Sequence, residues 1–209
     1  ILKTVAIGMF ALIATAANAS TFDQIKNASF ELYANDRPFC SGQFVTPTEF
    51  LTAAHCIDHA PKDAVFSIKT EKAGEESTFI LDIKNKNSKL DVATFTLNDK
   101  QAAFSYVDVA LPADVEIQTG QKVAVAGFPD VNEEFLFQFG TMSGKRTEMV
   151  GFPDNGNSPH YLIDVNTAPG NSGSGAYILV DGTWKLIGTL TGGPKYLWVS
   201  YFSTVESVN

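Results

Sequence analysis

Apolar positions along the chain recur in short runs and not with the period of an amphipathic helix. Each run is rich in β-branched and aromatic residues and is bounded by Gly, Pro, Asn or Asp, a pattern typical of short β-strands. Helical period is weak, and it predicts short helices only directly after Ala53 and over Thr204–Val208. The pattern predicts eleven strands: Phe30–Ala34, Phe39–Val45, Val65–Lys69, Thr78–Ile83, Val92–Leu97, Val123–Gly127, Phe135–Thr141, Tyr161–Val165, Ala176–Val180, Leu186–Leu190 and Leu197–Phe202.

This many strands in a chain of 209 residues would leave long exposed edges in one open sheet. Closed barrels or a sandwich are therefore favoured, and the fold class is all-β. A connection near Ala103–Gln121 divides the chain into two similar halves. We expect two structural halves, one over residues 20–105 and the other over residues 106–209.

The first nineteen residues have a different composition. Lys3 precedes an uncharged run, Thr4–Ala14, and small residues end at Ala17-Asn18-Ala19. The run is short for a membrane span, and the final small residues match a signal-peptidase cleavage pattern. Residues 1–19 are thus predicted to be a signal peptide, and the mature protein to be secreted, extracellular or periplasmic, and free of the membrane. The alternative is an uncleaved N-terminal anchor.

Composition narrows the functional classes. The chain is 44% hydrophobic and 18% charged, as in ordinary globular proteins, and its net charge of -8 disfavours binding to nucleic acid. Two cysteines, Cys40 and Cys56, cannot build a Cys-rich metal site. Because an exported chain enters an oxidising compartment, we expect the two to be paired as a disulfide.

Candidate chemistry lies in three segments, Leu51–Cys56, Leu90–Ala93 and Pro169–Gly175. A serine hydroxyl becomes a nucleophile when an imidazole can take its proton, and the imidazole needs a carboxylate on its other nitrogen. His55, Asp91 and Ser172 can supply these three catalytic roles. The Gly-rich turn would also bring the backbone N–H groups of Gly170 and Ser172 together as an oxyanion hole.

In these segments the chain resembles the chymotrypsin-type (trypsin-like) serine peptidases, which carry His, Asp and Ser in this order. Cys40 and Cys56 are spaced like that family's bridge behind the catalytic His, and Gly188–Gly193 is similar to its substrate-pairing strand. The resemblance covers nearly all of the chain after residue 19. It implies two six-stranded antiparallel β-barrels with the active site in the cleft between them. It also implies a monomeric serine endopeptidase that hydrolyses protein or peptide substrates through an acyl-enzyme.

Two other hydrolase classes are disfavoured by the same residues. An α/β-hydrolase needs its His after the nucleophile, and no His follows His160. His55 and His59 have a four-residue spacing but lack the adjacent Glu of a zinc peptidase. No metal and no cofactor are therefore expected, and His59 and His160 are predicted to be solvent-facing or loop residues.

Asn171 departs from the digestive members of the family, which have Asp before the nucleophile to bind a newly released N-terminus. The chain resembles the bacterial glutamyl endopeptidases and high-temperature-requirement proteases more closely. Because Asn171 carries no charge to bind such an N-terminus, the usual zymogen switch is expected to be absent.

Substrate preference is predicted only by position. Asn166 is expected toward the base of the specificity pocket, with Thr167, Thr191 and Gly193 on its walls. No Asp stands at that base, and Leu190 replaces the His of glutamyl endopeptidases, so a neutral, small or medium apolar side chain is expected. An inactive homologue acting as a binding protein, or an esterase on the same scaffold, remains an alternative.

Overall fold

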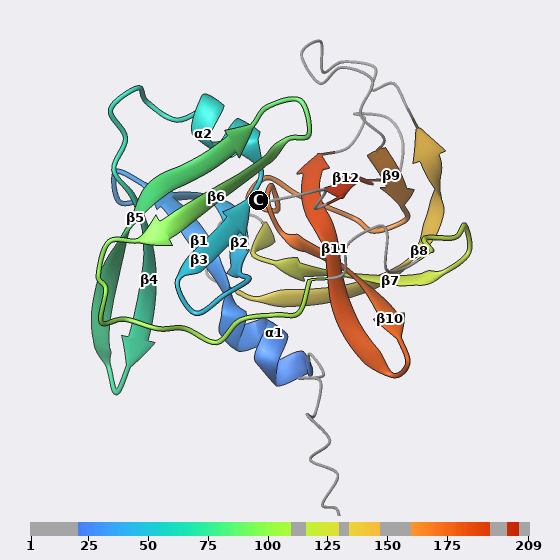
Figure 1. Cartoon of the computed structure of the whole chain (residues 1–209), viewed down its shortest axis with the longest axis horizontal. Coiled ribbons are helices and arrows are strands. Elements are labelled where there is room, and N and C mark those ends of the chain that lie inside the picture. Colours follow the sequence, from blue (N-terminus) through green and yellow to red (C-terminus); the bar gives the residue numbers. More distant parts are fainter. Residues whose placement is uncertain (1–20, 110–115, 130–133, 147–159, 193–199, 205–209) are drawn as a thin grey trace, which may run out of the picture.

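The computed structural model describes residues 21–109, 116–129, 134–146, 160–192 and 200–204. Their twelve strands form two closed antiparallel barrels of six strands each, which lie side by side (Figure 1). The predicted fold class is confirmed. The boundary expected between residues 105 and 106 falls in the connection between the two barrels, which separates strand β6 (Val92–Leu97) from strand β7 (Lys122–Gly127).

The first barrel is closed by pairing between its first and fourth strands, where Tyr33 lies opposite Ser67. Its strands follow the order β1-β2-β3-β6-β5-β4. Large side chains fill the interior, and Phe44, Phe50 and Phe95 are completely buried. The strands are β1 (Ser29–Ala34), β2 (Arg37–Phe44), β3 (Glu49–Thr52), β4 (Phe66–Lys72), β5 (Glu75–Asn87) and β6 (Val92–Leu97).

The second barrel has the same strand order, β7-β8-β9-β12-β11-β10, and β10 pairs with β7 to close it. Its core is smaller and more aliphatic, with Val123, Ile163 and Ile178 fully buried. The strands are β7 (Lys122–Gly127), β8 (Leu136–Arg146), β9 (His160–Ile163), β10 (Gly175–Val180), β11 (Thr183–Gly192) and β12 (Ser200–Thr204).

A third apolar cluster joins the barrels. Leu51 and Val92 of the first barrel pack in it with Ala124 and Tyr177 of the second. Each fully buried large apolar side chain contributes about 1.5–3 kcal/mol of transfer free energy. Burial at this junction therefore holds segments of the two barrels in fixed relative positions.

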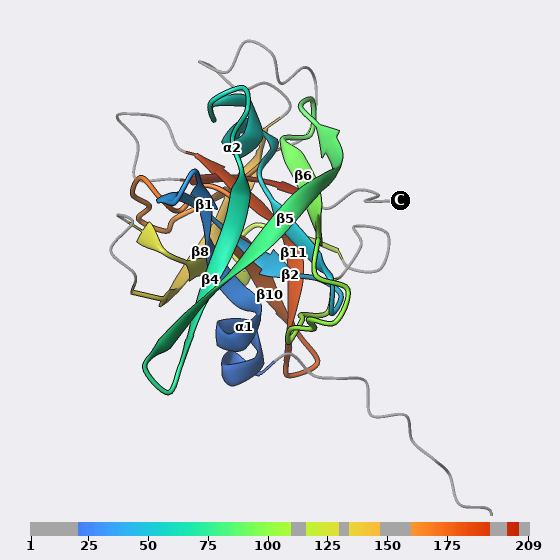
Figure 2. The ribbon, with the colours of Figure 1, turned by 90° about the vertical axis from the view of Figure 1, so that its left-hand side faces the viewer.

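The helices differ in part from expectation. The predicted turn after Ala53 is helix α2 (Ala54–Asp58), whereas helix α1 (Phe22–Ala28) was not predicted. Thr21 accepts a hydrogen bond from Gln24 N–H and caps α1, but only Ile25 and Ala28 are buried, which is too few apolar positions to reveal a helical period. In both views α1 and α2 lie at opposite ends of the molecule (Figures 1 and 2).

Near the C-terminus, Thr204 ends β12, and residues 205–208 of the second predicted helix lie outside the described residues. All eleven predicted strands overlap observed ones, and β3 is the strand that the pattern missed. Within the described ranges, no helix has the length and apolar character needed to cross a membrane.

The two remaining histidines differ in environment. His59 is exposed, as predicted, but His160 is completely buried in β9, so the prediction that it faces solvent or lies in a loop is wrong. β9 pairs with both β8 and β12, so His160 lies in a strand that has a neighbour on each side.

Candidate active site

His55 lies in the first turn of α2, and the side chain of Asp91 accepts a hydrogen bond from that turn. The N-cap residue, Ala53, makes no capping hydrogen bond through its side chain. The backbone N–H of His55, one of the donors that a helix leaves unpaired at its start, instead donates to Asp91 Oδ1 at 2.8 Å. Asp91 stands between β5 and β6 with φ +51, a left-handed conformation that Asp tolerates better than most residues.

The imidazole of His55 connects Asp91 with Ser172. Its Nδ1 lies 2.8 Å from Asp91 Oδ2, and its Nε2 lies 2.7 Å from Ser172 Oγ. The Asp91 side chain is 4% exposed and that of His55 is 19% exposed, so the carboxylate is shielded while the ring remains accessible. Because a carboxylate only accepts hydrogen bonds, the ring proton lies on Nδ1 and Nε2 presents its lone pair to the hydroxyl. The structure thus brings together the three residues predicted to be catalytic.

Ser172 follows a tight turn over Ala168, Pro169, Gly170 and Asn171. The Asn171 N–H donates to the Ala168 carbonyl at 3.1 Å, and Gly170 has φ +97. These features define a type II turn, with Pro and Gly at the positions that this turn prefers. The sequence of the turn therefore determines the direction of the Gly170 N–H.

Gly173, directly after Ser172, approaches the first barrel closely. Its φ is +82, and a Cβ atom at this position would lie 2.2 Å from the Ser41 carbonyl oxygen and 2.1 Å from Thr52 Oγ1. Only glycine fits this close approach. The Gly173 N–H donates to the Leu190 carbonyl at 2.8 Å, which anchors the end of the turn on β11.

The backbone N–H groups of Gly170 and Ser172 donate to no residue that the structure describes. Gly170 is itself buried. Since buried backbone donors are nearly always paired in proteins, two neighbouring unpaired ones beside a hydroxyl are available to a ligand oxygen. They are the two groups predicted to form the oxyanion hole, and that role stays a prediction.

Cys40 and Cys56 form a disulfide with a sequence separation of 16 residues, which joins β2 to α2 beside His55. With His55 they make up the group of possible metal ligands found among the described residues, and the three ligand atoms lie within 4.8 Å of one another. Sulfur bound in a disulfide is not a thiolate, however, and the His55 ring nitrogens face Asp91 and Ser172. These residues do not fit a metal site.

Asn171, the residue that departs from the digestive pattern, is 1% exposed. Its Oδ1 accepts a hydrogen bond from Ser174 Oγ at 3.1 Å, while its Nδ2 is buried without a described partner. Sequence reasoning identified the neutral Asn but not Ser174, because the two side chains meet only in the folded turn.

The residues predicted to line the specificity pocket lie in different environments. Asn166 is exposed, Thr167 is half-buried and Thr191 is buried in β11. Gly193 lies outside the described residues. Their role in substrate binding stays a prediction.

A second acid in α2, Asp58, belongs to a separate surface cluster. Its carboxylate accepts hydrogen bonds from Lys86 Nζ and from Ser88 Oγ. The hydrogen bond from Lys86 is the main reason that the pKa of Asp58 lies below its usual value. Asp58 is therefore engaged away from the His55 ring.

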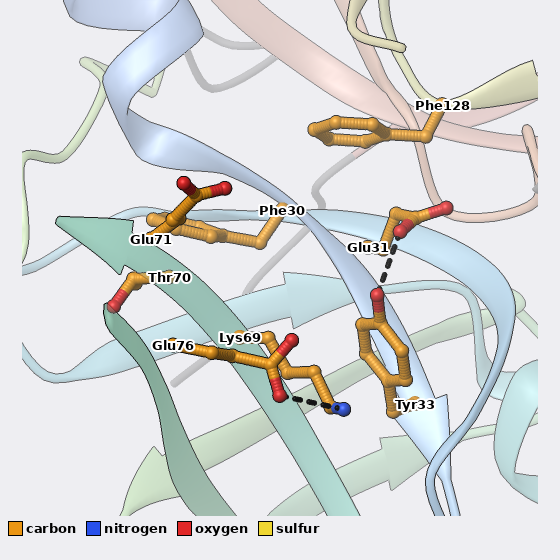
Figure 3. Close-up of a pocket in the computed structure, with 8 residues that line it drawn as sticks. All are labelled: Phe30, Glu31, Tyr33, Lys69, Thr70, Glu71, Glu76 and Phe128. Atoms are coloured by element: carbon orange, nitrogen blue, oxygen red, sulfur yellow. Dashed lines mark hydrogen bonds and ion pairs between the residues drawn. The ribbon is translucent and has the colours of Figure 1, made fainter. Parts of the chain in front are cut away.

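The structure also contains a hollow that sequence analysis did not foresee, and none of the three predicted catalytic residues lines it (Figure 3). Lys69 pairs with Glu76 at 3.0 Å, and the Tyr33 hydroxyl donates to Glu31 at 2.9 Å. Lys69 therefore offsets one of the three glutamates that line the hollow, and the lining keeps a net negative charge. The lining residues are Phe30, Glu31, Tyr33, Lys69, Thr70, Glu71, Glu76 and Phe128.

Comparison with known proteins bears on this geometry. A family model described as "Trypsin-like peptidase domain" matches residues 40–188. Among solved structures, the MamO protease domain from Magnetospirillum magneticum is similar, with TM-score 0.68 and 16% identity over 88% of this chain and 95% of that one. Deg5 has TM-score 0.68 and 16% identity, covering 88% of this chain and 86% of its own. The active form of the Rv3671c protease from M. tuberculosis has TM-score 0.67 and 15% identity, covering 87% and 78%.

At these identities the solved structures establish a common fold. A search of curated proteins found no match to this chain. The family model, in contrast, covers parts of both barrels and includes His55, Asp91 and Ser172.

Proposed function

Because the chain belongs to the family of trypsin-like peptidases and is a serine-type endopeptidase, we propose that it is exported and that its catalytic triad is His55, Asp91 and Ser172. The observation that carries the proposal is the hydrogen-bond chain from Asp91 through both ring nitrogens of His55 to Ser172 Oγ. No metal or cofactor is needed for this chemistry.

In the acylation step Ser172 Oγ attacks the scissile carbonyl carbon as His55 Nε2 takes the hydroxyl proton. The carbonyl π electrons move to oxygen, and Asp91 stabilises the imidazolium through Nδ1–H. When the tetrahedral adduct collapses, the C–N bond breaks and His55 returns the proton to the leaving amine. The products are a free amine and an ester of Ser172.

The Gly170 and Ser172 N–H groups would bind the oxyanion in this adduct. They lie beside the nucleophile and have no described acceptor in the chain, so they can donate to the developing negative charge without losing another hydrogen bond. In deacylation a water molecule repeats the sequence, with His55 again as base and then as acid. The carboxylic acid leaves and Ser172 regains its proton.

Export is supported by the composition of residues 1–19 and by the bridge between Cys40 and Cys56. Disulfides persist in oxidising compartments such as the periplasm or the exterior of the cell. The family implies peptide or protein substrates. A neutral, small or medium apolar side chain before the scissile bond, bound near Asn166 and Thr167, and a monomeric state both remain expectations.

The test uses a labelled fluorophosphonate together with matched peptide amide and peptide ester substrates. We expect the wild-type protein to be labelled and to cleave both substrates, and the Ser172→Ala variant to do neither while its circular dichroism spectrum is unchanged. Labelling with cleavage of the ester alone would make the protein an esterase. A folded wild-type protein that is not labelled would overturn the proposal in favour of a binding protein.

A further inference from the structure

Ser41 of β2 connects the first barrel with the turn that carries the nucleophile. It is completely buried. Its N–H donates to the Ser172 carbonyl at 2.7 Å, and its hydroxyl donates to the Gly170 carbonyl at 2.8 Å. The same hydroxyl accepts from Phe128 N–H at 2.9 Å, and the Ser41 carbonyl accepts from Thr52 Oγ1 at 2.7 Å.

The two carbonyl groups held by Ser41 belong to Gly170 and Ser172, the same two residues that offer the unpaired N–H groups. One bond comes from the Ser41 backbone, which any residue at this position could supply. The other comes from the side chain, which only a hydroxyl-bearing residue can supply in this geometry.

The hydroxyl bond completes the restraint on the peptide group that links Gly170 to Asn171. The N–H of this peptide donates to the Ala168 carbonyl, and its oxygen accepts from Ser41 Oγ. The first bond lies within the turn, whereas the second fixes the turn relative to β2. Without the hydroxyl, no described group would hold the Gly170 carbonyl against the first barrel.

We propose that Ser41 is a positioning residue, whose hydroxyl sets the Gly170 N–H at the correct place beside Ser172 Oγ for binding the oxyanion. The inference rests on the proposed function and concerns this chain's way of ordering its oxyanion turn. Oxyanion donors act over about 2.7–3.1 Å, and a misplacement of about 1 Å costs up to about a hundredfold in rate. A turn that keeps the hydrogen bond to the Ser172 carbonyl but loses the one to the Gly170 carbonyl should shift by less than about 1 Å.

The experiment compares Ser41→Ala with Thr52→Val. Ser41→Ala removes both bonds of the Ser41 hydroxyl, to the Gly170 carbonyl and from the Phe128 N–H. Thr52→Val removes a buried hydroxyl bond to the Ser41 carbonyl but leaves the bond between Ser41 Oγ and Gly170 intact. We measure kcat and KM for a chromogenic peptide ester, with rates normalised by active-site titration. We also measure inhibition by a peptidyl trifluoromethyl ketone, which forms an oxyanion with Ser172, and binding of the matched peptidyl alcohol, which does not.

For Ser41→Ala we expect kcat to fall about tenfold, KM to change less than about twofold, and ketone affinity to fall by the same factor as kcat. Binding of the alcohol should be unchanged. Thr52→Val should keep its kcat even where its melting temperature falls. An unchanged kcat in Ser41→Ala, or an equal loss in Thr52→Val, would overturn the inference.

Ser41→Thr provides a second measurement that does not depend on the alanine variant folding. It keeps a hydroxyl on the same carbon and should retain kcat within about threefold of wild type. If it is folded and as slow as Ser41→Ala, the hydroxyl is not the positioning group. Wild type and Ser172→Ala are measured in the same assay, and activity that does not depend on Ser172 would indicate failure of the proposed function itself.

Discussion

Asp91 binds His55 through both of its carboxylate oxygens. Oδ1 accepts from the His55 backbone N–H and Oδ2 lies against the ring Nδ1, each at 2.8 Å. One carboxylate thus completes the first turn of a helix that has no side-chain cap, and also orients the imidazole carried by that turn. An isosteric replacement can separate these two roles.

Replacing Asp91 by Asn should keep the fold and remove most of the activity. Asn also tolerates a φ of +51, and its oxygen can still accept from the His55 backbone N–H. Its NH₂ group would donate to Nδ1, which leaves the ring proton on Nε2, where the ring cannot accept the Ser172 proton. We expect turnover near neutral pH to fall by roughly four orders of magnitude, the loss that this replacement causes in Ser-His-Asp triads. Steady-state kinetics and thermal unfolding check both effects.

Asp58→Asn is the matched control, because it changes an acid of the same helix that is bound to Lys86 and Ser88. Its turnover should equal that of wild type. Near-normal rates in Asp91→Asn, or a large loss in Asp58→Asn, would assign the orienting role to a different acid. Asp91→Ala should in addition lower the free energy of unfolding by about 1 kcal/mol through loss of the helix cap.

Ser172→Ala and His55→Ala should each abolish hydrolysis of a peptide ester and leave the melting temperature nearly unchanged. The double variant should lose little more than either single one, since the members of a triad act as a unit. The check is a double-mutant cycle on kcat/KM. Additive losses would contradict a joint role for the two residues.

Activity should not require a free N-terminus. Asn171 carries no charge and its Oδ1 is bound by Ser174, while α1 lies at the other end of the molecule from α2 (Figure 2). Protein with a short tag before Ser20 should therefore hydrolyse a chromogenic ester at a rate close to that of untagged protein. A tagged protein that is inert until it is trimmed would reveal a zymogen step.

Asn171→Asp should lower both activity and stability, because it places a carboxylate with no described cationic partner at a position that is 1% exposed. Burial disfavours the ionised form and raises the folded-state pKa of the new group. Its penalty is therefore absent at low pH and grows as the pH rises through the carboxyl group's range. Unfolding measured from acid to neutral pH tests this sign, with Asn171→Ser as the uncharged control.

No thiol should titrate in the mature protein, whether native or denatured, because Cys40 and Cys56 are bonded to each other. Replacing both by Ala should lower the free energy of unfolding by roughly 3 kcal/mol in the chain-entropy description of a loop of this size. Thiol titration and chemical denaturation provide the two measurements. Two reactive thiols in the purified native protein would contradict the pairing.

Export predicts that the secreted protein begins at Ser20-Thr21-Phe22. N-terminal sequencing of protein recovered from outside the cytoplasm tests this directly. A chain that still carries Lys3 would mean that the N-terminal segment is kept as an anchor.

Local pattern was sufficient where one strand or one motif carries its own signal. Val92–Leu97 was predicted with the bounds that β6 has, and the order of His55, Asp91 and Ser172 pointed to their chemistry. Two short elements were not predicted because they are too short to carry such a signal. In α1 only two residues are buried, and the four residues of β3 run directly into the segment that carries His55, so neither shows a periodic pattern.

Contacts between distant segments were decided by the tertiary structure alone. His160 is completely buried in β9, which pairs with a strand on each side, although its neighbours in the sequence are typical of a loop. Ser41 meets Gly170 across 129 positions in the sequence, and this contact exists only because the two barrels pack against each other. Residue types and their spacing determine which groups can act as base, nucleophile or donor. A hydrogen bond also needs its two atoms within about 3 Å, and for groups so far apart in the sequence only the packing of the whole chain provides that distance.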